Sequence, residues 1–232
     1  MNVLKNYLKP LFLFFILMSD CFAAKVSLRF DTREAATIFN IMDNVSLWRK
    51  GFCDPAYQNY WQQSFPILEE DQQWFQNYKT LREKYDQGEQ NYNDYLGEEG
   101  LFMHSSTLNE DPLAAAFYAS ATLNDAFKIL DGVLEESELT FLKSFYERFK
   151  SQYFVFLKQE NLKTLEDNTK KILENEKITD FLESICSFYQ VTEPMEFTVL
   201  HMWYPPIPQA KAFVSGNYLI LCNNDKYLNP KS

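Results

Sequence analysis

Apolar side chains recur every three or four residues along most of the chain, which is the spacing of amphipathic helices. A stripe of this kind runs from Ala35 to Val45 and predicts a first helix of about four turns. Similar stripes predict a short helix from Pro55, helices at 69–86 and 114–130, one from Glu135 onward, and helices at 163–176 and 178–189. The stripes are rich in Phe, Tyr and Trp, so we expect these helices to pack against one another through aromatic side chains.

Acidic residues mark three of the helix starts. Asp31 and Glu34 have the spacing of a capping box, in which the first side chain binds an amide of the first turn and the second reaches back. Asp54-Pro55 and Asp111-Pro112 each place a capping carboxylate before a proline. Proline suits the first helical position because its missing N–H is not needed there.

The helical spacing gives way to strict alternation after Val191. Along 196–204, one face carries Phe197, Val199, His201 and Trp203, and the other carries Thr198, Leu200, Met202 and Tyr204. Because both faces are largely apolar, we expect this strand to be covered on both sides. Prolines then end the strand, extended structure resumes at 210–214, and 217–222 forms a second strand.

These patterns predict a mainly α protein, in which a helical bundle is followed by a small C-terminal β-hairpin or partial sheet in an α+β arrangement. The expected organisation is a signal peptide at 1–23, a helical domain at 24–189 and a short β segment at 190–232.

Residues 1–23 have the parts of a secretory signal peptide, with two lysines before an apolar run at 11–18 and small residues up to Ala23. The run is shorter than the roughly 20 residues that span a bilayer, so cleavage after Ala23 is favoured over an uncleaved anchor. Lipidation at Cys21 is the alternative, and Asp20 directly before it disfavours this. We therefore expect an exported protein, periplasmic or secreted, without stable membrane insertion after signal cleavage.

The negative charge of the chain narrows the range of partners. The formal net charge is −10 at pH 7, and a field of that sign repels phosphate backbones, so no nucleic-acid partner is expected. A peptide or protein partner is compatible with this negative charge.

Cleavage of the signal peptide would leave three cysteines, Cys53, Cys186 and Cys222. This odd number fits one disulfide plus a free thiol, or a partner cysteine missing from a shortened chain, and spacing does not decide the pairing.

Candidate catalytic groups are few. The two histidines, His104 and His201, lie far apart, and the sequence contains no H-E-x-x-H, no C-x-x-C and no Gly-rich phosphate loop. His201, in an apolar strand, is interpreted as a packed histidine satisfied by one hydrogen bond, and His104 as part of a polar loop. Paired carboxylates such as Glu69-Glu70 and Glu135-Glu136 start helices, where the helix dipole favours negative charge. We therefore predict no catalytic residue, no metal ligand and no cofactor in this chain.

Three pieces towards the end of the chain resemble a known family. They are the run FYQVTEP at 188–194, the strand at 196–203 and the stretch AKAFVSGNYLIL at 210–221. Together they are similar to the segment just upstream of the zinc-binding helix in gluzincin-like (zincin) metallopeptidases. In that family, an aromatic Tyr-x-Val helix end leads to a strand, a loop with small residues, and a second strand with an Ile-Leu run. The segment at 30–36 also looks like the opening of exported members.

The resemblance implies a strand that pairs with an extended peptide substrate through its backbone. It places this substrate edge at Ala212, Phe213, Val214, Ser215 and Gly216. It also implies an active-site helix, with two His ligands and a catalytic Glu, after the second strand, and 223–232 carries none of these residues. The segment 190–232 is then the start of a truncated zincin-like core. We therefore expect an inactive chain, and zinc only where a catalytic half is supplied.

An alternative from a different class is a periplasmic or secreted helical binding or scaffold protein without enzymatic activity. In this interpretation the terminal hairpin caps a helical bundle. The long aromatic stripes favour the scaffold, whereas the strand pair without a following zinc-binding helix favours the peptidase-like interpretation. The sequence leaves both open.

Overall fold

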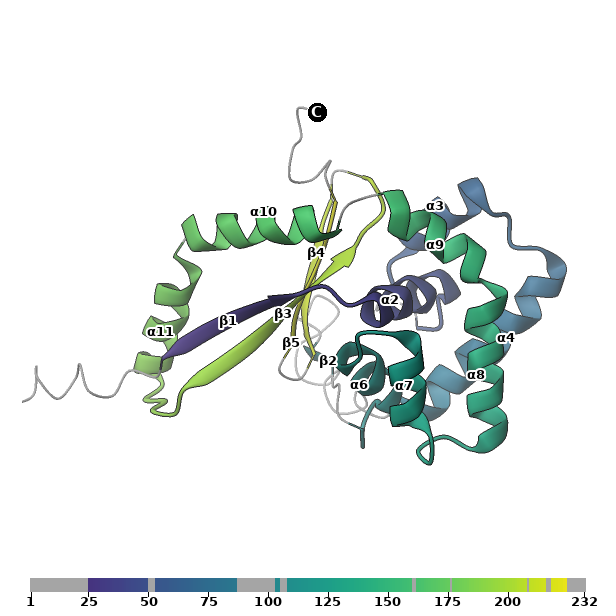
Figure 1. Cartoon of the computed structure of the whole chain (residues 1–232), viewed down its shortest axis with the longest axis horizontal. Coiled ribbons are helices and arrows are strands. Elements are labelled where there is room, and N and C mark those ends of the chain that lie inside the picture. Colours follow the sequence, from purple (N-terminus) through teal and green to yellow (C-terminus); the bar gives the residue numbers. More distant parts are fainter. Residues whose placement is uncertain are drawn as a thin grey trace, which may run out of the picture. The chain divides into compact units, whose positions relative to one another are not determined.

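A computed structural model of the chain describes residues 25–49, 53–86, 103–104, 108–159, 162–175, 177–207, 209–215 and 218–224. In chain order the elements are β1 (Val26–Asp31), α2 (Glu34–Ser46), α3 (Pro55–Ser64), α4 (Glu69–Tyr85), β2 (Met103–His104), α6 (Pro112–Ala119), α7 (Leu123–Leu130), α8 (Glu136–Arg148), α9 (Lys150–Gln159), α10 (Leu162–Asn175), α11 (Ile178–Phe188), β3 (Met195–Trp203), β4 (Lys211–Ser215) and β5 (Tyr218–Asn223) (Figure 1). The predicted fold class, mainly α with a small sheet in an α+β arrangement, is confirmed. The predicted signal peptide, residues 1–23, lies outside the described residues.

The strands are ordered β1-β3-β5-β4-β2 within the described residues. β3 runs parallel to β5, with Val199 beside Leu219 and Trp203 beside Asn223. β4 lies antiparallel to β5 and parallel to β2. The three C-terminal strands therefore form the predicted partial sheet, whereas β1 and β2 were not predicted.

Contacts divide the chain into two compact units. In its described part, unit 1 comprises 25–29 and Thr169–Phe197, and unit 2 comprises 30–168 and 198–224. Unit 1 has its own small apolar cluster, in which Val26 and Cys186 are buried and Leu182, Val191, Met195 and Phe197 pack against them. Its first strand is held by a hydrogen bond from the Met195 amide to the Lys25 carbonyl, 2.9 Å long.

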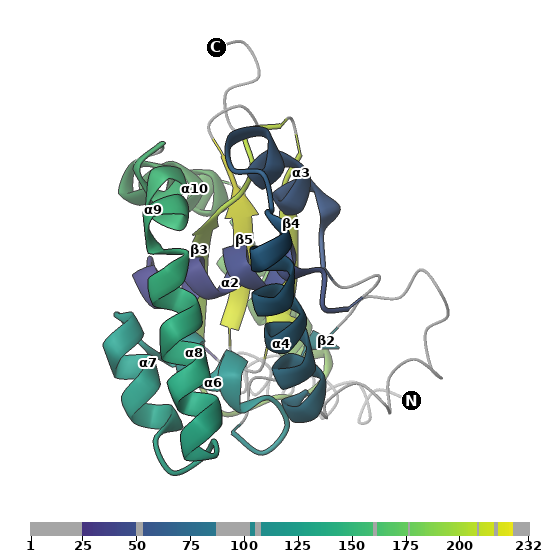
Figure 2. The same ribbon diagram turned by 90° about the vertical axis from the view of Figure 1, so that its right-hand side faces the viewer.

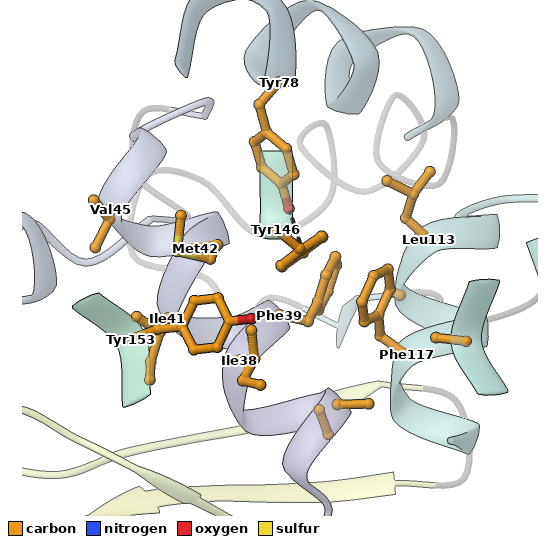
Figure 3. Close-up of a cluster of buried hydrophobic side chains, with 14 of the residues drawn as sticks. Ile38, Phe39, Ile41, Met42, Val45, Tyr78, Leu113, Phe117, Tyr146 and Tyr153 are labelled. Atoms are coloured by element: carbon orange, nitrogen blue, oxygen red, sulfur yellow. Dashed lines mark hydrogen bonds between the residues drawn. The ribbon is translucent and has the colours of Figure 1, made fainter. Parts of the chain in front are cut away.

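Unit 2 is built around α2. Every residue from Ala35 to Val45 is buried, so the helix has no solvent face and is not the amphipathic helix that its apolar stripe predicts. Figure 2 shows α2 crossing strands β3 and β5, and Figure 1 shows α4 and α8 on its other side. The apolar side chains of α2 belong to one core cluster (Figure 3), in which Phe39 stacks on Phe117 with ring centroids 4.9 Å apart.

Two of the three predicted helix starts are confirmed. The Asp54 carboxylate accepts from the Ala56 amide at 2.9 Å, and the Asp111 carboxylate accepts from the Ala114 amide at 3.0 Å. The Asp31 capping box is wrong: Asp31 ends β1, and its carboxylate binds Arg33 Nε at 2.8 Å instead.

The single helix predicted at 114–130 is two helices. α6 ends at Ala119 and α7 begins at Leu123. Two hydroxyl groups stabilise the break, because Ser120 donates to the Ala116 carbonyl at 2.7 Å and the Thr122 hydroxyl accepts from the Asp125 amide at 3.3 Å. Side chains of this kind compete with continued helix, which a count of apolar positions does not detect.

One buried cation joins three helices of unit 2. Arg82 of α4 is fully buried and binds both carboxylate oxygens of Asp111, at 2.7 and 2.9 Å. Its Nη2 also donates to Asp43 of α2 at 3.2 Å. The guanidinium lies over the rings of Trp48 and Phe39, 4.5 and 5.0 Å from their centroids. Burial raises the pKa of Asp43, and the positive charge of Arg82 opposes this rise.

Replacing Arg82 by Met should therefore destabilise the protein strongly. The change leaves Asp43 and Asp111 buried without their cation, which costs about 3–5 kcal/mol in comparable buried pairs. The free energy of unfolding, from chemical denaturation followed by circular dichroism, tests this.

The matched control is Lys84→Met on the same helix. Lys84 forms an exposed pair with Glu135 and Glu138, at 2.9 and 2.7 Å, and exposed pairs contribute little. Similar losses for the two variants would contradict a special role for the buried guanidinium.

Candidate functional site

The predicted substrate edge falls in β4. Ala212, Phe213, Val214 and Ser215 lie in this strand, and Gly216 lies outside the described residues. Ser215 pairs with Tyr218 where the hairpin closes, and Ala212 pairs with Leu221. The predicted edge residues are therefore brought together in one strand, although their role in substrate binding remains a prediction.

The closure of the hairpin decides which backbone groups of β4 point outward. Residues that close a hairpin over a two-residue connection exchange both backbone hydrogen bonds, and the alternation then continues along the strand. The backbone N–H and C=O groups of Val214 and Ala212 consequently point away from β5. The described part of β2 pairs with Val214 and Ser215, and Ala212 lies beyond that pairing with its side chain exposed.

His201 is buried in the sheet next to the end of β5. It is 1% exposed, and its Nε2 is hydrogen-bonded to the side-chain oxygen of Asn223. The interpretation of His201 as a packed histidine with one hydrogen bond is confirmed. Burial lowers its pKa, while the hydrogen bond that Nε2 donates to Asn223 Oδ1 and the negative charge of Glu166 act in the opposite direction. A neutral, enclosed imidazole is suited to packing.

The end of β3 is tied to α2 and α3 by a buried polar network. Tyr57 donates to the Trp203 carbonyl at 2.8 Å and accepts from Asn40 Nδ2 at 2.8 Å. Tyr204 donates to the Asp54 carboxylate at 2.6 Å, while the Asp54 amide donates to Asn44. These contacts hold the partial sheet against the helices. On the far side of β5 lies β4, which pairs with β5 on one side and, at Val214 and Ser215, with β2 on the other.

Cys53, Cys186 and Cys222 are buried and form no disulfide with one another. Burial raises the pKa of Cys53 to about 12 and that of Cys222 to about 11. Both thiols of unit 2 therefore stay protonated near neutral pH, and the thiol is the unreactive form. Cys21, the lipidation alternative, lies outside the described residues.

One member of each carboxylate pair singled out in the sequence binds a cation at a helix start, Glu70 with Arg148 at 3.1 Å and Glu135 with Lys84 at 2.9 Å. Asp71, in the first turn of α4, binds Arg148 at 2.8 Å. Glu135 and Glu138, at the start of α8, both bind Lys84. Across the described ranges, no three His, Cys, Asp or Glu side chains gather as a metal site. His104 lies in β2.

The sequence did not reveal a cleft between α7, α8 and α9. Tyr153 was assigned to an apolar stripe, yet it lines a cavity of about 280 Å³ together with Lys143 and Glu147. Only its hydroxyl group distinguishes Tyr153 from the Phe residues of the same stripe. No local signal in the sequence marks the cleft, because other parts of its wall lie at 34 and 122–127, far from Tyr153 along the chain.

Replacing His201 by Gln should flatten the dependence of stability on pH. Because burial lowers the pKa of His201 in the folded state, protonation favours unfolding. Its contribution is present above the unfolded-state pKa of about 6.5 and is lost as the pH falls through the folded-state value. Between about pH 7.5 and 4.5, the wild type should lose more unfolding free energy than His201→Gln. Equal losses in denaturation curves would show that His201 does not titrate in this way.

No protein-family model matches this chain, and neither a curated protein nor a solved structure matches it. None of the helices in the described part of the chain has the length and hydropathy of a membrane span. Function is therefore inferred from the residues and their contacts.

Proposed function

We propose that the chain carries the frame of a zinc-metallopeptidase-like domain without its zinc site, and that it binds extended peptides without hydrolysing them. The observation that carries this proposal is the order of elements α11, β3, β4, β5. It is the order that the resemblance implies upstream of a zinc-binding helix: a helix ending in Tyr-x-Val, a strand, a segment of small residues and a second strand. The antiparallel β4 supplies the strand expected to meet a substrate.

The peptide would add to β4 next to Ala212. There the backbone N–H and C=O point away from β5, and the side chain is exposed. A strand added at such an edge gains affinity from main-chain hydrogen bonds, so it needs no special side chain. The neighbouring β2 pairs with Val214 and Ser215, which limits the proposed contact to the beginning of β4.

We also propose that the protein is exported, periplasmic or secreted. The leader-like residues 1–23 support this.

The alternative, a helical binding protein without enzymatic activity, is supported by one specific observation. The cleft between α7, α8 and α9 is lined by both charged and aromatic side chains. The two proposals differ in where a ligand binds, since one uses β4 and the other uses the helices.

The purified chain should contain no stoichiometric zinc and should not cleave casein, even with zinc added. The reason is the absence of an H-E-x-x-H motif and the presence of only two histidines. Metal content by mass spectrometry and release of casein fragments measure both, with an active zinc peptidase as the positive control. One zinc per chain together with casein cleavage would refute the inactivity.

Peptide binding should depend on the Ala212 amide. Replacing Ala212 by Pro removes an outward N–H while leaving the pairing with β5, and proline is tolerated on edge strands. Losing one hydrogen bond should weaken binding of a fluorescein-labelled peptide of alternating Val and Thr by about three- to tenfold. Fluorescence anisotropy measures this change.

The matched control is Ala212→Val, which keeps the N–H and suits a strand. It should bind the peptide like the wild type. Equal affinities for Ala212→Pro and Ala212→Val, with both variants folded by circular dichroism, would rule out β4 as the peptide edge.

A further inference from the structure

The cleft of unit 2 contains a buried polar group that the protein leaves without a partner. Tyr153 of α9 is fully buried, and its hydroxyl forms no hydrogen bond within the described residues. Buried hydroxyl groups are nearly always hydrogen-bonded, so such an exception needs an explanation. Other tyrosines of the same core follow the rule, since Tyr57 and Tyr78 donate at 2.8 Å to Trp203 and Asp43.

Tyr153 lines a cavity with residues from four helices. The cavity has a volume of about 280 Å³, and its wall includes Glu34 of α2, Leu123 of α7, Lys143 and Glu147 of α8, and Phe154 of α9. It adjoins a wider depression of about 620 Å³ through Asn124, Phe127, Lys143 and Glu147, which line both.

Figure 3 shows the Tyr153 ring lying against α2. Burial raises the pKa of Tyr153, and the negative charges of Glu147 and Glu34 add to this effect.

The charges around the cavity are of both signs. Lys143 forms no ion pair within the described residues, so its ammonium group is available to an anion. Glu34 likewise has no cationic partner there, and Glu147 binds Lys150 at 3.1 Å. The start of α7, capped by Thr122, also lines the cavity and adds the positive end of a helix dipole. Phe127 and Phe154 provide apolar walls.

We infer that this cavity binds a small zwitterion of the size of a free amino acid with an apolar side chain. Lys143 binds the ligand's carboxylate, Glu34 and Glu147 bind its ammonium group, and the Tyr153 hydroxyl donates to one of its oxygens. The apolar side chain lies against Phe127 and Phe154. The volume lies just below the roughly 300 Å³ at which drug-sized sites begin, so it suits a ligand of this size. This site is separate from β4 and does not rest on the proposed peptide edge.

The test is a calorimetric titration of the full chain with L-phenylalanine. Two matched probes each lack one charge: N-acetyl-L-phenylalanine lacks the ammonium group, and L-phenylalaninamide lacks the carboxylate. The expected result is saturable binding of L-phenylalanine, with both analogues at least about tenfold weaker because each leaves a charged group of the cavity unpaired. No saturable binding, or equal binding of all three compounds, would overturn the inference.

Three variants separate the site from non-specific uptake. Tyr153→Phe removes only the hydroxyl and should weaken binding about three- to tenfold, with an unchanged or higher melting temperature because no hydrogen bond of the protein is lost. Lys143→Met should weaken binding roughly tenfold. Lys128→Met, which changes a residue of the wider depression alone, should leave the affinity unchanged. Unchanged affinity in both Tyr153→Phe and Lys143→Met would overturn the inference, whatever the result for Ala212→Pro.

Discussion

The structure depends on the burial of α2 from Ala35 to Val45. A helix without a solvent face is normally apolar all round, yet α2 carries Thr37, Asn40, Asp43 and Asn44 at buried positions. Buried polar groups without partners are costly, so Asn40, Asp43 and Asn44 favour particular neighbours. The Thr37 hydroxyl has no hydrogen-bond partner within the described residues. Asn40 donates a hydrogen bond to the Tyr57 hydroxyl, and Asn44 accepts one from the Asp54 amide at the start of α3. Asp43 accepts one from the Arg82 guanidinium. These contacts fix α3 and α4 against α2.

The charge balance at Asp43 explains why three helices meet there. One guanidinium faces two buried carboxylates, so a negative charge is left over, and burial raises the pKa of Asp43. Tyr78 compensates in part by donating to Asp43 at 2.8 Å. Buried ion pairs add little net stability compared with apolar packing, but losing one partner is expensive. Such a cluster therefore favours one arrangement of α2, α4 and α6 over others.

Local signals in the sequence predicted the parts of this fold that depend on neighbouring residues. Asp54-Pro55 and Asp111-Pro112 start helices as expected, and the alternation around His201 marks a strand buried on both faces. The sequence could not show that the polar residues of α2 are buried, because their partners lie far along the chain: Arg82 is separated from Asp43 by 39 residues. The same limit hid the cleft, since nothing near Tyr153 in the sequence indicates an unpartnered hydroxyl.

The polar groups that stabilise the fold differ from those that we propose as binding groups. The polar side chains that hold the partial sheet to α2 and α3 bind one another, as the chain from Asn40 through Tyr57 to Trp203 shows. A ligand would have to break these contacts to use them. The Tyr153 hydroxyl, by contrast, has no partner to lose within the described residues, and the outward backbone groups at Ala212 are directed away from their own hairpin. Recognition at either place would leave the buried network of α2 intact, so changes at the binding groups can be separated from changes in folding.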